Sequence, residues 1–225
     1  MFYLILFSGE LLVLFFVSRN LTTYLFHFFR LFTKNNHVIF FVISLLYFPG
    51  TLLHEMSHYI VAVSCMLKVT DIRIFPVIQS GAVRLGSVSF ERKDSIRSII
   101  VGIAPIAGGM LFFYFISVFS LFPPHSFPLS IFIIYLIFSI SSTMFSSKKD
   151  MGDLLYAIPF LLLIGGALYF AASYSPRFYY LANEQVGQGV IQFIQGIHKY
   201  IIISIIINSV FLISAKAAIT IWRKP

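Results

Sequence analysis

The sequence predicts a mainly α-helical, polytopic membrane protein with about six transmembrane helices and a small β insertion. Hydrophobic residues occupy 59% of its 225 positions, and its mean hydropathy is +0.92. Charged residues supply only 11%, whereas soluble domains carry about 25%. A soluble domain of this size could not bury so much apolar surface. The composition therefore excludes a soluble enzyme, a disordered protein and, with a single cysteine, a disulfide scaffold.

Six apolar segments have the length that a membrane helix needs. About 20 apolar residues cross a bilayer, and this length divides the chain into residues 1–18, 37–66, 98–122, 127–145, 152–173 and 199–222. The aromatic stretch 21–32 contains Arg30, which is typical of an interfacial helix or of part of a longer hairpin. We find no repeat and no low-complexity linker, so we expect one domain over residues 1–225.

Residues 71–91 break the helical pattern. Apolar and polar residues alternate around positions 72–74, 83–85 and 88–90, and Gly81 lies between the runs. Alternation with a period of two predicts a β-hairpin or small sheet over about residues 69–92. An open hairpin cannot span lipid, because its edges would leave backbone groups without hydrogen bonds. We therefore expect this segment at the membrane interface or against the helices.

Basic residues predict the orientation. If all six segments cross, one side receives ten Lys and Arg residues and the other side five: Lys68, Arg73, Arg84, Arg92, Lys93, Arg97, Lys148, Lys149, Arg223 and Lys224 against Arg19, Arg30, Lys34, Arg177 and Lys199. Positive residues favour the cytoplasm, so we expect both termini inside and a multi-pass protein of the cell membrane. No basic run alternates with aromatic residues, which argues against nucleic-acid binding despite the net charge of +8.

Residues 54–58 spell H-E-M-S-H, which predicts a metal site. On a helix, His54 and His58 share one face, and Glu55 is rotated to the side of it. Two neutral nitrogen ligands and a carboxylate base are what a zinc hydrolase needs. The motif lies inside the apolar run 38–66, where ionisable side chains are costly and indicate function. We predict that His54 and His58 bind zinc and that Glu55 is the general base.

A third protein ligand has few candidates, because the chain has only eight acidic residues. Asp150 and Asp153 begin the fifth segment, on the predicted side where the second segment leaves the membrane. Ser147 with Asp150 also reads as the start of a helix, with the pattern S-x-x-D. The residue pattern alone does not rank Asp150 above Asp153.

At these residues the sequence resembles the site-2 protease family of intramembrane zinc metalloproteases. The resemblance rests on FPGTLLHEMSHYIVA at 48–62, the strand-rich loop after it, GIAPIAGG at 102–109 and SSTMFSSKKDMGD at 141–153. It implies one zinc ion held by both motif histidines and a distal aspartate. Many members carry that aspartate in N-x-x-P-x-x-P-L-D-G, where this chain has Ser142, Phe145, Lys148 and Met151 for Asn, the two Pro and Gly. We place the third ligand at Asp150, with Asp153 as the reserve.

The resemblance implies an intramembrane endopeptidase that hydrolyses peptide bonds of transmembrane or membrane-proximal segments. The expected partner is a membrane protein with a single-span helix, and the site is expected near the cytoplasmic face. Because helical carbonyls are hydrogen-bonded, such a substrate must unwind, and the strand-rich loop either pairs with it or forms a structural cap. Two alternatives are a non-proteolytic zinc-binding protein, as a degenerate scaffold or ion carrier, and a hydrolase of lipid or another small amide.

Two further patterns concern packing. Pro49 and Gly50 lie one turn before His54, and a proline there predicts a kink in the helix. Gly102, Gly108 and Gly109 surround Pro105, and small residues in membrane helices favour close helix packing.

Overall fold

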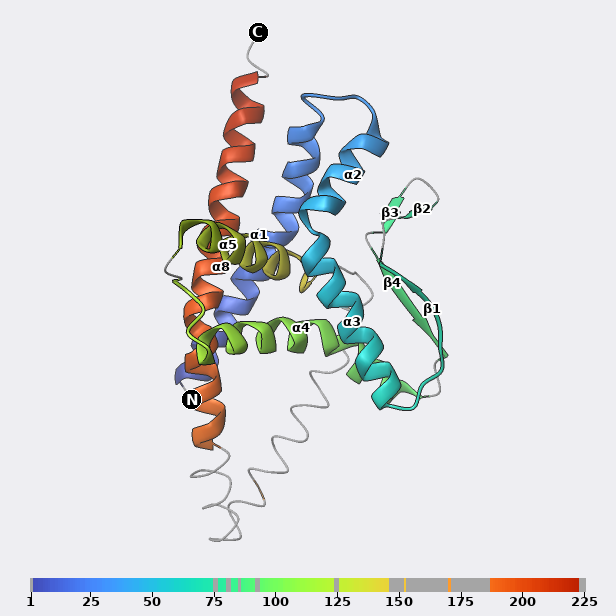
Figure 1. Ribbon diagram of the computed structural model, residues 1–225, viewed down its shortest axis with the longest axis vertical. Coiled ribbons are helices and arrows are strands. Elements are labelled where there is room, and N and C mark those ends of the chain that lie inside the picture. The colour runs from blue at the N-terminus through green and yellow to red at the C-terminus, as the bar shows by residue number, and fades with distance from the viewer. Residues whose placement is uncertain are drawn as a thin grey trace.

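The computed structural model describes residues 2–74, 77–79, 82–84, 86–91, 94–123, 126–145, 152, 170 and 187–222. These residues form a mainly helical fold with a small antiparallel β insertion, as predicted (Figure 1). The helices are α1 (Phe2–Phe29), α2 (Asn36–Leu46), α3 (Phe48–Ser64), α4 (Ser95–Val118), α5 (Phe127–Thr143) and α8 (Gly187–Trp222). The strands are β1 (Val69–Arg73), β2 (Val77–Gln79), β3 (Ala82–Arg84) and β4 (Ser87–Phe90).

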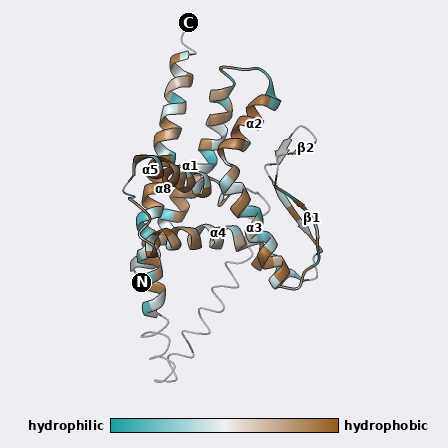
Figure 2. Ribbon diagram, in the orientation of Figure 1, coloured by the Kyte–Doolittle hydropathy of each residue, from teal (hydrophilic) through white to brown (hydrophobic). Residues whose placement is uncertain are grey.

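Apolar helices long enough to cross a membrane are present, but in the described ranges they are fewer than six. Leu6–Phe29, Ser95–Val118 and Gln188–Trp222 qualify singly, and α2 with α3 adds a fourth span if the bent pair counts as one. Figure 2 shows hydrophobic residues along these helices. Helix α5 is apolar but only 17 residues long. The predicted fifth segment, 152–173, lies outside the described residues except for positions 152 and 170.

The first and last helices, α1 and α8, run side by side in the same direction. Glu10 and Tyr24 of α1 contact His198 and Lys216 of α8 in the same order, with Glu10 2.9 Å from His198 Nδ1 and the Tyr24 ring 4.6 Å from Lys216 Nζ. The ring of Phe32, three residues after α1, lies 6.2 Å from that of Trp222 near the end of α8. Phe2 and Trp222 therefore lie at opposite ends of the pair (Figure 1). If both helices cross the membrane, this parallel arrangement places their outer ends on opposite sides of it, whereas both termini were expected on one side, because apolar length alone does not show the direction of a segment. In the described residues the candidate spans number three, or four with the bent pair, rather than six.

The predicted second span is broken at Tyr47. Helix α2 ends at Leu46, α3 begins at Phe48, and their axes differ by 72°. Pro49 lies in the first turn of α3, where its missing N–H costs nothing. In an unbroken helix Pro49 would lie in the interior, where it could not donate to the carbonyl of residue 45 and its ring would clash with that carbonyl. The kink predicted from Pro49 is confirmed, and the single segment 37–66 is corrected to two helices.

Small residues bring α3, α4 and α5 into close contact. A Cβ atom added to Gly50 would overlap Ser139 O and Thr143 Oγ1 of α5. Added to Gly108 it would overlap Ser57 Oγ of α3, and added to Gly109 it would lie 2.6 Å from Met144 Cγ. Close approach of this kind requires glycine. The packing role predicted for the glycines is thus confirmed for Gly108 and Gly109.

The β insertion is an antiparallel hairpin in two parts, in agreement with the alternation of residues 69–92. β1 pairs with β4, with Ile72 opposite Val88, and β2 pairs with β3, with Ile78 opposite Val83. Val69 and Phe90 pack against a buried cluster formed by Ala62 of α3, Val101 of α4 and Leu67, which lies between α3 and β1. The hairpin therefore lies against α3 and the start of α4, as expected for strands that cannot span lipid.

Candidate metal centre

Helix α3 places the two motif histidines side by side. The ring centroids of His54 and His58 are 4.9 Å apart and their planes differ by 83°. The two residues are 4% and 8% exposed. This is the arrangement that the spacing of four residues predicts for one face of a helix. Metal binding itself stays a prediction.

Each imidazole is held through its Nδ1 atom by a backbone carbonyl of another helix. His54 Nδ1 lies 2.9 Å from the carbonyl oxygen of Thr143 in α5, and His58 Nδ1 lies 2.8 Å from that of Val101 in α4. A carbonyl oxygen only accepts, so both Nδ1 atoms donate. In a neutral imidazole the unprotonated nitrogen is then Nε2, the atom that ligates a metal. Bonds from Nδ1–H to carbonyls are the usual outer-shell arrangement of metal-binding histidines.

Thr143 can accept this bond because it is the last residue of α5. The final carbonyls of a helix have no helical N–H partner. The same end of α5 is fixed by Asn208 of α8, which is fully buried. Asn208 Nδ2 donates to Ser141 Oγ at 2.9 Å, and Ser142 Oγ donates to Asn208 Oδ1 at 2.7 Å. Contacts from α8 therefore fix the carbonyl that orients His54.

Glu55 lies at the β insertion, a contact that the sequence does not show. Its residue exposure is 7%. A Cβ atom added to Gly86, just before β4, would lie 2.7 Å from Glu55 Cγ and 2.9 Å from Oε1. The hairpin backbone thus covers the carboxylate that the motif assigns as base. The sequence feature that could have indicated this contact is the glycine at position 86 beside a predicted strand, because such a glycine often marks a close approach of the backbone to another group.

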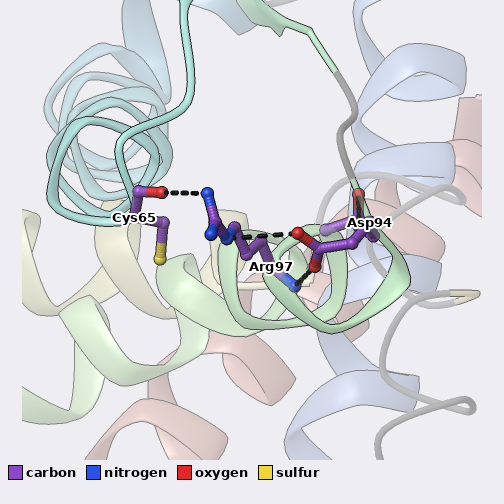
Figure 3. Close-up of polar contacts among 4 residues, drawn as sticks. Cys65, Asp94 and Arg97 are labelled. Carbon is purple, nitrogen blue, oxygen red and sulfur yellow. Dashed lines mark hydrogen bonds and ion pairs between the residues drawn. The ribbon is translucent and has the colours of Figure 1, made fainter.

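Hydrogen bonds join the end of α3 to the start of α4 and close the base of the hairpin between them. Arg97 Nη1 donates to the carbonyl of Cys65 at the end of α3 at 3.2 Å, and Asp94 accepts from the Arg97 backbone N–H at 2.8 Å (Figure 3). Asp94 is the N-cap of α4. Glu91 N–H donates to Lys68 O at 3.0 Å across the stem. These bonds hold the end of α3, the start of α4 and the base of the hairpin together.

The third ligand is not placed. In the described part of the chain, no group of three or more His, Cys, Asp and Glu side chains is arranged to hold a metal ion. Asp150 and Asp153 both lie outside that part. The assignment of Asp150, with Asp153 as the reserve, stays a prediction.

Comparison with protein-family models, curated proteins and solved structures gives no match for this chain. The resemblance to site-2 proteases stays a prediction that rests on the motifs.

Proposed function

We propose that this protein is an intramembrane zinc metalloendopeptidase. The observation that carries the proposal is the pair of Nδ1 bonds from His54 and His58 to the carbonyls of two other helices. Because both Nδ1 atoms donate, each ring in its neutral form has its unprotonated nitrogen at Nε2, the atom that ligates a metal. Glu55, the residue after His54, is buried as well. The donor set therefore fits a zinc site with an adjacent base. A buried ionisable cluster in an apolar helix also indicates function rather than packing.

In this proposal His54, His58 and Asp150 hold the zinc ion, with Asp153 as the reserve ligand. Zinc, when bound, would supply the Lewis acidity that polarises the scissile carbonyl and activates a water molecule for attack. Glu55 accepts the proton of the attacking water and delivers it to the leaving amine nitrogen. Because Gly86 lies against this carboxylate, the hairpin keeps the base in place and limits the access of bulk water.

The proposed substrate is a transmembrane or membrane-proximal protein segment that reaches the site in extended form. Helical carbonyls are hydrogen-bonded within their own helix and must be released before attack. β4 pairs with β1 in a two-stranded sheet, and an extended peptide that added to the other side of β4 would extend this sheet. β4 begins next to Gly86, which contacts Glu55. Pairing there would bring a peptide close to the base.

We further propose that the site lies near the cytoplasmic face of the cell membrane. The segment 67–97 that follows α3 carries six Lys and Arg residues, whereas the turn between α1 and α2 carries Arg30 and Lys34. The helices α2 and α3 separate these two regions. By the positive-inside tendency, the end of α3 with the β hairpin is the cytoplasmic one.

Zinc removal tests the proposed function. The purified protein, reconstituted in liposomes with a panel of single-span helices, is expected to cleave at least one of them. A chelator should abolish cleavage, and one equivalent of zinc should restore it, because the ion supplies the Lewis acid. Zinc uptake without cleavage of any helix would favour the non-proteolytic alternative, and lipid hydrolysis would favour the third class.

Gly86→Ala should reduce cleavage by about a hundredfold while zinc content stays at the wild-type level. The added Cβ atom would have to displace the Glu55 side chain or the hairpin, and a displacement of about 1 Å in a catalytic group costs on the order of a hundredfold. Gly189→Ala is the matched control, because an added Cβ there meets nothing within 4 Å. Wild-type cleavage by Gly86→Ala would show that this contact does not position the base.

A further inference from the structure

Helix α4 contains a proline four residues after the carbonyl that holds His58. Pro105 lies inside α4, and Val101 O accepts the bond from His58 Nδ1 at 2.8 Å. In a regular α-helix the carbonyl of residue 101 accepts the N–H of residue 105. Proline has no N–H, and its ring pushes away the carbonyl four residues earlier. The helical donor that Val101 O would normally have is therefore missing at the position that meets the metal-site histidine.

We propose that Pro105 is a positioning residue of the metal site, which turns the Val101 carbonyl away from its own helix and toward His58. This inference rests on the proposed function, because it assigns a role toward the same zinc site. Val101 and Pro105 are both buried. A buried carbonyl needs a donor, and the His58 Nδ1–H supplies it. The bond in turn fixes the ring and its tautomer, which leaves Nε2 unprotonated for the ion.

His54 also donates to a carbonyl that lacks its usual helical donor, but for a different reason. His54 donates to Thr143 O, and Thr143 ends α5, where the last carbonyls also lack a helical donor. Both acceptors thus occur where a helix leaves a carbonyl without its usual partner. One results from the end of a helix and the other from a proline within it.

Packing is the competing explanation for Pro105, because Gly108 and Gly109 in the same helix make close contacts with α3 and α5. The two explanations predict different results for Pro105→Ala. A packing role predicts loss of thermal stability. A positioning role predicts weaker zinc binding without that loss, because proline is the least favourable residue inside a helix and alanine the most favourable.

The test measures zinc affinity of the full-length protein in detergent by competition with a fluorescent chelator. Pro105→Ala is expected to bind zinc about tenfold more weakly, at the lower end of the effect of losing an outer-shell partner of a metal-binding histidine. The visible spectrum of bound Co²⁺ should change with the orientation of His58. The thermal midpoint of the zinc-free variant should equal or exceed that of the wild type.

Pro128→Ala is the matched control, because Pro128 lies in the first turn of α5, where a proline removes no helical bond. It should leave zinc affinity unchanged. Equal zinc affinity in Pro105→Ala and wild type would overturn the inference while leaving the proposed function intact. Weaker affinity together with a lower zinc-free midpoint would also overturn it, in favour of packing. Absence of zinc binding by the wild type would overturn the proposed function and the inference together.

Discussion

Glu55→Gln is expected to lower the rate of peptide cleavage by at least about a hundredfold, because general acid–base catalysis contributes 10²–10⁴-fold. Glutamine keeps the size and much of the hydrogen bonding of the side chain but accepts no proton. Its contact with Gly86 should persist. Zinc content should stay at the wild-type level, because Glu55 is assigned as base and not as ligand. The measurement is cleavage of a single-span helix in liposomes, with metal analysis of the same sample.

Glu91→Gln is the control for this variant. Glu91 is an exposed acid that pairs with Lys68 at 3.5 Å in the hairpin stem, and exposed pairs of this kind contribute little to stability. It should cleave at the wild-type rate. Equal cleavage by Glu55→Gln and wild type would contradict the mechanism. Loss of zinc from Glu55→Gln would instead assign this carboxylate to the metal.

Asp150→Ala is expected to abolish stoichiometric zinc binding, whereas Asp153→Ala should retain it. Removal of a direct ligand should weaken binding more than removal of an outer-shell partner, which costs about 10–100-fold. His54 and His58 alone leave the ion one protein ligand short of the three that catalytic zinc sites have. The measurement is zinc per chain after gel filtration in detergent.

The pair of variants decides between the two acids. Normal zinc in Asp150→Ala together with loss of zinc in Asp153→Ala would move the third ligand to Asp153. Normal zinc in both variants would exclude both acids and require a ligand from elsewhere in the chain.

The presence of apolar helices could be predicted, because the length of an apolar run can be counted in the sequence. The residues at which these helices begin and end could not. The expected first segment covers residues 1–18. Helix α1 continues to Phe29, since Asn20 donates to its own helix at Phe16 O and Arg19 lies over the Phe15 ring. Similarly, α8 begins at Gly187 rather than 199, and His198 within it pairs with Glu10. Local bonds and one distant partner made these polar residues acceptable in long helices.

The shared face of the two motif histidines was predictable from a spacing of four residues, but the groups around them were not. The bonds from His54 and His58 end on backbone carbonyls of Thr143 and Val101, and every residue has such a carbonyl. Pro105 marks Val101 O as a carbonyl without its helical donor, but only the packing of α3 against α4 shows that His58 meets it. Gly86 is 31 positions from Glu55 in the sequence, and only the folded hairpin brings them together. Contacts that depend on backbone position and on tertiary approach are therefore the part that residue patterns miss.

The parallel pairing of α1 and α8 also has a consequence for biosynthesis. Glu10 and His198 are 188 positions apart, so at about 5–20 residues per second a ribosome needs roughly 10–40 s to add the imidazole after the carboxylate. For that interval the nascent first helix holds an acidic side chain among apolar residues before its partner exists. A chain that terminates before α8 never gains the partner, and its first helix keeps a carboxylate that is costly in lipid. Such fragments are expected to be substrates for membrane quality control.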